Sequence, residues 1–489
     1  KLISSGKIEY VGIGNTQKSK KSSLSVNANY LNLAPYQAAI PQNVDWNSPF
    51  QSLSGETVYR YNFNNGILKV YAAFDSSKFD INQESINSAE KIRVDLNNNN
   101  FYLNSSYKGV FGNNWQITSG LSYGYSNNKI NLDSDKVAND ENAAHLKLKL
   151  RKSFSDRLKL SFGADYFVTQ FDEDFKENPG SVFTNGYDLS IAAVYTEADI
   201  FFSKKWAAKV GIRASNNDLL NETVLAPRIS FAYKMAKNSQ FSFAYGDFTQ
   251  TPNSEYIKYS NDHQFESEKA SHYILNFQYN KNGKTFRAEA YFKDYSNLVK
   301  FNTEKATYNS VYDNTGSGYA KGLDLFWRDG KSIKNVEYWI SYSYIDSERD
   351  YKNFPTQATP NFIASNSLSI VAKYWINDWK SQVGFTNSYS SGRPYNNTNE
   401  TKFMNEKTKS YNSLSFNWAY LLSQQKILYF SVSNVLGSHN VFGYEYANNP
   451  DNKGFYNRKE IIPTADRFFF VGFFWTISND KKDNQLRNL

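Results

Sequence analysis

The stretch Asp466–Ser478, which reads DRFFFVGFFWTIS, decides the fold of this chain. It is too short for a transmembrane helix, which needs about 20 apolar residues. It has the right length for a tilted transmembrane β-strand, which needs about 9–11. Taken alone, the run fits a buried core strand of a soluble protein equally well. The rest of the chain favours the membrane.

Hydropathy alone would place the chain among soluble proteins. The mean hydropathy is −0.64 over 489 residues, and no apolar run reaches the length of a spanning helix. Mean hydropathy does not detect barrel strands, because their lipid-facing apolar residues alternate with lumen-facing polar ones and the two cancel. The aromatic content is 17%, with 37 Tyr, 37 Phe and 9 Trp. Tyr and Trp are favoured where an apolar ring meets water, as at the two rims of a membrane barrel.

Composition also excludes several classes of protein. There are no cysteines, so neither a disulfide framework nor a thiolate metal site is possible. The net charge of +8 is spread along the chain without a basic stripe, which argues against nucleic acid as a partner. No Gly-rich phosphate loop or nucleophile elbow is present, and nothing suggests an enzyme. No signal peptide begins the chain at Lys1, so an outer-membrane protein would need further N-terminal sequence.

One pattern recurs from end to end: two alternating strands joined by a tiny polar turn, followed by a long polar loop. The tight turns include Asn64–Gly66, which carries an Asn-Gly hairpin signal, Ser155–Arg157 and Asn377-Asp378. The long loops are predicted near 34–54, 131–143, 172–186, 216–225, 252–270, 302–318, 350–362, 396–410 and 442–465. Short connections on one side and long ones on the other indicate an outer-membrane barrel with periplasmic turns and extracellular loops.

The alternation within strands supports this interpretation. In Ala144–Phe154 the leucines at 146, 148 and 150 share one face, while Lys147, Lys149 and Arg151 share the other. A cation on a lipid-facing position costs about 2–4 kcal/mol at mid-bilayer, so the charged face is predicted to line the lumen. A water-facing soluble sheet would alternate in the same way. Strands of ten or more residues, with short turns on one side and long loops on the other, favour a membrane barrel instead.

We therefore predict an all-β fold, a transmembrane antiparallel β-barrel with about 21 strands. Single-chain bacterial barrels have an even number of strands, so 22 is expected, with the first strand missing. On this interpretation residues 1–478 form the barrel, and 479–489 are a polar tail in the periplasm, either solvated or docked on a partner. The free edges of Lys7–Gly14 and Asp466–Ser478 would then lie too far apart to pair directly.

Several motifs resemble those of TonB-dependent outer-membrane receptors, in the style of Bacteroidetes-type members. The matching segments are Leu225–Ser230, Phe243–Gly246, Gln250–Pro252, Ala290–Val299, Asn314–Asp324, Ser390–Tyr395 and Ser433–Leu436. The resemblance covers the barrel portion of that family and lacks its plug domain and TonB box. It implies uptake, across the outer membrane, of a specific ligand such as a siderophore, vitamin, glycan or peptide, without a cofactor.

The same resemblance implies the partners. They are outer-membrane lipid and lipopolysaccharide, a plug domain or N-terminal segment outside this chain, the TonB complex through those missing parts, and a surface lipoprotein. An alternative function is a barrel scaffold, a subunit of a larger outer-membrane complex. A plug-encoding region upstream would favour transport, and a permanently plug-free barrel bound to partners would favour the scaffold.

Aromatic and basic side chains in the long loops are the candidate ligand contacts, because loops on a rigid scaffold concentrate binding function. They are Tyr36, Trp46, Arg393, Tyr444, Tyr446 and Arg458. Anchoring at the membrane rim or packing within a loop would explain each of them singly.

No metal site is predicted. The four histidines are scattered without ligand spacing. The acidic runs Asp133–Asp135, Asp140-Glu141 and Asp172–Asp174 could hold calcium through oxygen ligands, but solvated acidic loops explain them more simply.

Overall fold

A computed structural model describes residues 9–34, 37, 45–177, 180–259, 265–463, 466–477 and 486. Nearly all of the described regular structure is β-strand. The elements are β1 (Glu9–Lys18), β2 (Ser22–Asn32), β3 (Asp45–Phe63), β4 (Gly66–Gln83), β5 (Ile92–Phe111), β6 (Trp115–Leu132), β7 (Asp135–Ser153), β8 (Leu158–Lys176), β9 (Val182–Phe201), β10 (Trp206–Asn217), β11 (Glu222–Ala236), β12 (Ser239–Gln250), α2 (Ser254–Ile257), β13 (Glu268–Lys281), β14 (Lys284–Phe301), β15 (Tyr312–Asp329), β16 (Val336–Asp350), β17 (Asn366–Ile376), β18 (Ser381–Ser390), β19 (Pro394–Tyr395), β20 (Glu406–Lys407), β21 (Tyr411–Ser423), β22 (Lys426–Ser433), β23 (Gly443–Tyr446), β24 (Arg458–Ile461) and β25 (Phe468–Trp475). No helix in this described part is long and apolar enough to cross a membrane.

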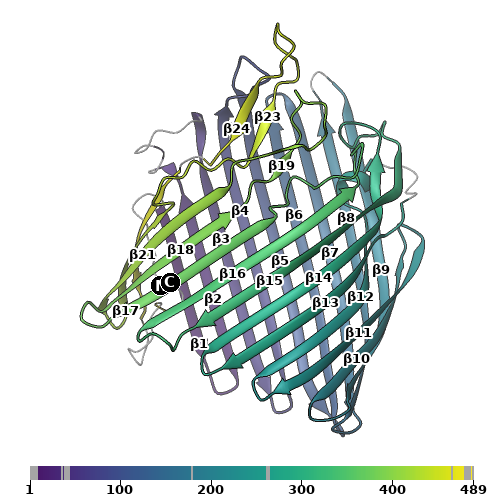
Figure 1. Ribbon diagram of the computed structural model, residues 1–489, viewed down its shortest axis with the longest axis vertical. Coiled ribbons are helices and arrows are strands. Elements are labelled where there is room, and N and C mark those ends of the chain that lie inside the picture. Colours follow the sequence, from purple (N-terminus) through teal and green to yellow (C-terminus); the bar gives the residue numbers. More distant parts are fainter. Residues whose placement is uncertain are drawn as a thin grey trace.

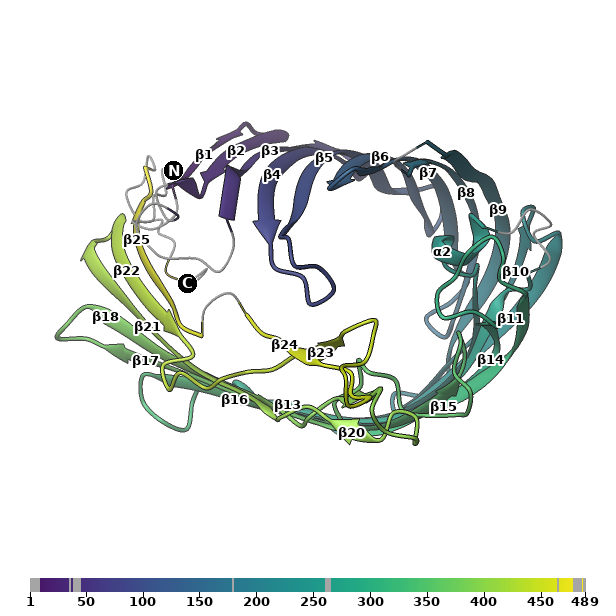
Figure 2. The same cartoon turned by 90° about the horizontal axis from the view of Figure 1, so that it is seen from above.

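One antiparallel sheet of 21 strands forms the wall of the molecule. Each strand from β1 to β18 pairs with the next along the chain, and the sheet continues through β21, β22 and β25. Seen from above, these strands surround a wide lumen (Figure 2). The all-β, antiparallel fold with 21 strands is therefore confirmed.

The two edge strands of the sheet are β1 and β25. Strand β1 pairs with β2 and strand β25 pairs with β22, and no pairing joins β1 to β25 among the residues that the structure describes. The expectation of a 22nd strand between them stays a prediction, as do the division of the chain at residue 478 and the plug outside it.

The two faces of the wall differ as the alternation predicted. Leu146 and Leu148 keep 56% and 42% of their surface exposed on one face of β7. On the other face, Lys149 Nζ lies 2.9 Å from Glu197 and Arg151 Nη2 lies 2.6 Å from Asp199. Ion pairs of this kind belong to the lumen, because lipid offers the leucines a better environment than it offers a cation.

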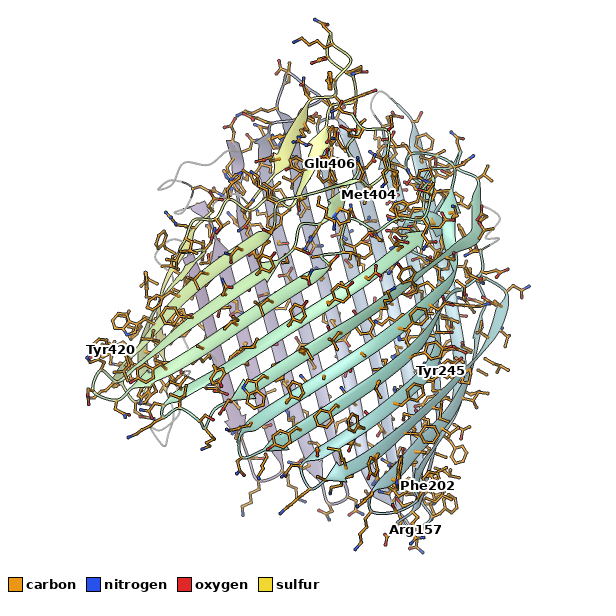
Figure 3. The ribbon with its side chains drawn as sticks, viewed as in Figure 1. Arg157, Phe202, Tyr245, Met404, Glu406 and Tyr420 are labelled. Atoms are coloured by element: carbon orange, nitrogen blue, oxygen red, sulfur yellow. The ribbon has the colours of Figure 1, made fainter. Side chains whose placement is uncertain are left out.

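Aromatic side chains mark the height of the membrane on β6. Trp115, stacked on Phe111, and Tyr125 lie on the same outward face, ten residues apart along the strand. At about 3.3 Å per residue and a tilt near 40°, ten residues rise about 25 Å, the height of a barrel's apolar band. Phe202 and Arg157 lie at the lower rim, opposite Met404 and Glu406 (Figure 3).

Beyond this band the strands continue toward the cell surface. On the outward face at this height, Tyr125 and Asn127 of β6 both donate a hydrogen bond to Asp140 of β7. The outward face is therefore polar above the band. The predicted loops at 131–143 and 172–186 are therefore wrong, because most of those residues extend β6, β7, β8 and β9. Water bathes both faces there, so polar residues no longer alternate with apolar ones.

Other predicted boundaries shift for the same reason. Strand β3 already begins at Asp45 and passes through two irregularities in register before Gln51. Strand β1 extends to Lys18, four residues beyond Gly14, where the first strand was predicted to end. The loops predicted at 216–225 and 302–318 shrink to 218–221 and 302–311.

Most of the predicted periplasmic tail lies outside the described residues. Leu486 is described, and it packs against a buried cluster of Ala419, Ile427 and Phe474 on β21, β22 and β25. Phe474 belongs to the inward face of the closing strand, since Phe473 and Trp475 on either side are exposed. The periplasmic position of the tail stays a prediction.

Replacing Leu148 by arginine should destabilise the folded barrel by about 2–4 kcal/mol, because a cation would then face the middle of the bilayer. The free energy of unfolding in lipid vesicles, from urea titration, measures the change. Lys147→Arg is the control, since it keeps a cation on the lumenal face 3.9 Å from Asp165. Equal losses for the two variants would contradict the assignment of the faces.

Candidate functional site at the extracellular mouth

Two small hairpins stand at the upper rim of the barrel (Figure 1). The β19–β20 hairpin belongs to the connection between β18 and β21, and the β23–β24 hairpin to the connection between β22 and β25. Both short ladders are antiparallel, and Tyr446 of β23 pairs with Arg458 of β24. Gly454 allows the turn between β23 and β24, since its φ is +81°.

Six side chains join the two hairpins, and we call them the hairpin cluster: Tyr395, Asn397, Glu406, Tyr444, Tyr446 and Arg458. Arg458 Nη1 donates to the Tyr395 hydroxyl at 2.9 Å, and its guanidinium lies 4.5 Å from the centre of the Tyr444 ring. The Tyr395 and Tyr444 rings are 4.6 Å apart. Arginine stacked on one aromatic ring and bonded to another is held in a defined orientation.

Polar contacts complete the hairpin cluster. The Tyr446 hydroxyl donates to Asn397 Oδ1 at 2.9 Å, and Asn397 Nδ2 donates to Glu406 Oε1 at 2.9 Å. The Tyr395 hydroxyl donates to the other carboxylate oxygen of Glu406. Tyr395 and Asn397 are buried, whereas the Arg458 side chain remains 45% exposed. Because arginine carries five N–H donors, Arg458 can still offer some of them to a ligand in the mouth.

The hairpin cluster contains two ionisable groups with shifted pKa values. Hydrogen bonds from Tyr395 and Asn397 hold the pKa of the Glu406 carboxyl below its ordinary value of 4.5. Burial and the bond to Glu406 raise the pKa of the Tyr395 hydroxyl, so it stays a donor at neutral pH. A lowered carboxyl pKa contributes stability that is present above the ordinary value and lost as pH falls through the value in the folded state.

We therefore expect the two hairpins to separate when the pH falls below about 4.5, as Glu406 takes up a proton. Amide hydrogen exchange of residues 443–461, corrected for the intrinsic rate at each pH, measures this separation. Exchange in the β22 ladder serves as the internal reference. Glu406→Gln should remove most of the acid dependence, and an unchanged dependence in that variant would contradict the role of Glu406.

The β23–β24 hairpin also reaches the opposite wall. Its backbone N–H at Asn448 donates to Asn87 Oδ1 at 2.6 Å, and Lys459 Nζ lies 3.3 Å from the Glu84 carbonyl and 3.9 Å from its carboxylate. We call these contacts between the hairpin and the β4–β5 loop the mouth bridge. Figure 2 shows the two segments reaching over the lumen from opposite sides.

A second group of loops is held by an apolar core. Leu220, Tyr256, Ile257, Val299 and Phe301 are buried together with Phe265 where the β10–β11, β12–β13 and β14–β15 connections meet. Helix α2 begins there because the Asn253 side chain accepts a hydrogen bond from the Glu255 N–H at 2.9 Å.

A buried ion pair ties this group to the wall. Lys258 Nζ lies 2.9 Å from both carboxylate oxygens of Glu173 on β8, and Asn185 donates to the same carboxylate at 3.2 Å. Burial lowers the pKa of Lys258, but the hydrogen bond and the negative charge of Glu173, together with Tyr259, hold that pKa above its ordinary value. The ammonium is therefore charged at neutral pH.

The sequence-predicted contacts separate into two groups. Tyr444, Tyr446 and Arg458 come together in the hairpin cluster. Arg393 lies in the same connection as β19 but is exposed, and its backbone N–H donates to Thr408 Oγ1 at 3.0 Å beside a cavity of about 290 Å³.

Two predicted contacts remain, Trp46 and Tyr36. Trp46 packs edge-on against Phe79 at 6.4 Å, and Tyr36 lies outside the described residues. Their role as ligand contacts stays a prediction, as does that of the other four.

The acidic runs do not form a cation-binding loop. Asp172, Glu173 and Asp174 lie on β8, where successive side chains point to opposite faces, and Glu173 is bound to Lys258. Within the described ranges, no group of three or more His, Asp or Glu side chains is placed to hold a metal ion.

The fold and the mouth define an outer-membrane β-barrel with a loop-covered entrance. Residues 21–435 match the family model described as TonB dependent receptor-like, beta-barrel, so the chain belongs to this family of outer-membrane transporters, which are not enzymes. Family membership implies an interaction with TonB and a plug. Comparison with curated protein sequences gave no match.

Solved structures of similar fold share little sequence with this chain. The outer membrane transporter YddB from Escherichia coli has a TM-score of 0.73 at 10% identity, covering 96% of this chain and 75% of that one. The siderophore receptor PiuA from Acinetobacter baumannii has 0.73 at 12%, covering 97% and 80%. The ferric enterobactin receptor PfeA from Pseudomonas aeruginosa has 0.71 at 11%, covering 97% and 79%.

Sequence reasoning missed Tyr395, Asn397 and Glu406, although they complete the hairpin cluster. Tyr395 follows Arg393-Pro394, so an aromatic residue beside a predicted basic contact was an available signal. Nothing in the sequence marks Asn397 and Glu406, because Asn397 meets Tyr446, 49 residues away along the chain, and Glu406 meets Arg458 of the same distant hairpin.

Proposed function

We propose that this chain takes up a specific organic ligand across the outer membrane and captures it at the extracellular mouth beside the hairpin cluster. The observation that carries this proposal is the partly exposed Arg458, which Tyr395 and Tyr444 hold in a fixed orientation above the lumen. Aromatic rings and a guanidinium recognise polar organic molecules by stacking and by directed hydrogen bonds.

The mouth bridge supports the proposal in a second way. It lies between the cell surface and the lumen, and its contacts are exposed: the side chains of Lys459 and Glu84 retain 46% and 68% of their accessible surface. Such pairs contribute about 0–1 kcal/mol each, so the bridge can open and close at little cost. A ligand could therefore be admitted and then covered without unfolding any strand.

Uptake is the direct test. The full-length protein is expressed in cells that lack their own receptors, and accumulation of a radiolabelled ferric siderophore, vitamin, oligosaccharide and peptide is measured with and without TonB. One ligand should accumulate only when TonB is present. Arg458→Ala should lower its uptake, and Arg157→Ala at the opposite rim should leave it unchanged (Figure 3).

Failure of every ligand class to accumulate, with the protein present and folded in the outer membrane, would contradict the transport proposal. So would equal uptake with and without TonB. Stable co-purification with envelope proteins in the absence of uptake would instead indicate the scaffold function.

A further inference from the structure

The lumenal wall carries two neighbouring regions with different charge pairing. On β7–β10 the cations are paired with carboxylates on nearby strands. Lys149 Nζ lies 2.9 Å from Glu197, Lys209 Nζ lies 3.3 Å from Asp199, and Arg213 Nη1 lies 2.6 Å from Asp165. The positive charges named here are therefore balanced by carboxylates of the same wall.

The next four strands, β11 to β14, carry lumenal cations without a carboxylate partner among the described residues. The strand register places Arg228 of β11, Gly246 of β12, His272 of β13 and Lys293 of β14 side by side. We call these four residues the cationic row. Neither Arg228 nor Lys293 has a carboxylate within 4 Å among the described residues.

The cationic row faces the lumen. The adjacent row of the same strands is Ile229, Tyr245, Tyr273 and Phe292, all apolar or aromatic. Successive residues of a strand point to opposite faces, so the apolar row faces lipid and the cationic row faces inward.

Aromatic side chains orient the donors of the cationic row. The Arg228 guanidinium lies 4.5 Å from the centre of the Phe248 ring, and the Phe248 and His272 rings are 4.6 Å apart. Lys293 Nζ lies 5.3 Å from the centre of the Tyr291 ring. Stacking uses the face of a guanidinium and leaves the N–H groups along its edge free to bind an acceptor.

Gly246 lets the Arg228 and Phe248 side chains pack closely over its backbone. A Cβ atom there would lie 3.1 Å from Arg228 Cγ and 3.3 Å from Phe248 Cε2. A cavity of about 220 Å³ opens here, lined by Arg228, Phe248 and His272 among others. Glu197 also borders this cavity, but its carboxylate is bound to Lys149.

We infer that the cationic row binds a small multivalent oxyanion, of the polycarboxylate type, inside the lumen. Arg228 and Lys293 stand three strands apart, which is about 14 Å between their backbones. Their long side chains can converge on one molecule with several carboxylates, whereas a single carboxylate would meet only one of them. This inference rests on the proposed function, because it gives the ligand a second contact below the mouth.

Direct binding tests the inference without TonB and without uptake. Citrate is titrated by calorimetry into the purified, folded full-length protein in detergent at low ionic strength, with glucose as a neutral probe. Citrate should bind and glucose should not. Arg228→Gln and Lys293→Gln should each weaken citrate binding about ten-fold, the loss expected for one charge-assisted hydrogen bond.

Two further variants separate specific contacts from net charge. Arg213→Gln removes the same charge from a lumenal cation that is already paired, and it should change the dissociation constant less than about two-fold. Arg228→Lys keeps the charge but loses the planar fork, so its affinity should lie between those of the wild type and Arg228→Gln.

No saturable citrate binding by the wild type would overturn the inference, as would an equal loss in Arg213→Gln and Arg228→Gln. A protein that transports its ligand but does not bind citrate would contradict the inference that the cationic row binds a polycarboxylate, and would leave the proposed function standing. A protein that binds citrate through Arg228 but accumulates nothing contradicts the proposed function alone.

Discussion

Cross-linking the β23–β24 hairpin to the β4–β5 loop is expected to reduce uptake to the level of cells without the protein. Cysteines at positions 87 and 448 would stand where the Asn448 N–H now meets Asn87 Oδ1. These 489 residues contain no native cysteine, so a short bismaleimide, which forms a thioether with each thiol, would join only this pair within them. A covalent mouth bridge cannot open, whereas the native one is held by a few exposed polar contacts.

The control is a second cysteine pair at Gly443 and Ile461, which face each other within the hairpin. Cross-linking there stiffens the hairpin but leaves it free of the opposite wall, so uptake should persist. Each single-cysteine variant, treated with the same reagent, controls for modification alone. Full uptake by the cross-linked 87–448 protein would show that the ligand enters without opening the mouth bridge.

Within the membrane band, the sequence contained nearly all the information needed to predict the wall. The leucines and cations of β7 alternate because lipid and a polar lumen lie on its two sides, and each strand can be read from its own residues. That alternation predicted the two faces, and the count of tight turns and long loops predicted the strand number.

Above the band the prediction failed for a physical reason. The residues around Asp140 in β7 and the run Asp172–Asp174 in β8 are polar on both faces because water surrounds the strands there. Only the ladder of backbone hydrogen bonds keeps them extended, and that ladder depends on the neighbouring strand. A single strand's residues therefore cannot distinguish such an extension from a loop.

The mouth was predicted in part. Tyr444, Tyr446 and Arg458 were found because bulky aromatic and basic residues are uncommon enough in loops to be noticed. Their partners Tyr395, Asn397 and Glu406 were missed because their importance depends on a contact between two different loops. The same holds for Glu173 and Lys258, which are 85 residues apart and meet only when the barrel closes around the lumen.

Replacing Glu173 by glutamine should detach α2 and the loop after it from the wall. The Glu173 side chain is 6% exposed and the Lys258 side chain 16%, so the variant leaves a largely buried cation without its counter-charge. Loss of one partner of a buried pair costs about 3–5 kcal/mol, which raises the population of the detached loop by roughly two to four orders of magnitude.

Chymotrypsin cleavage beside Tyr256 measures that population, because this ring is only 5% exposed in the folded loop. Cleavage follows the open fraction when opening and closing are fast. Glu255→Gln is the matched control in the same segment: it breaks the Lys352–Glu255 pair, whose side chains are 39% and 50% exposed, and should cost at most about 1 kcal/mol. The double variant Glu173→Leu with Lys258→Met removes both buried charges and should restore resistance to cleavage. Equal cleavage of the Glu173→Gln and Glu255→Gln proteins would show that the buried pair does not hold the loop.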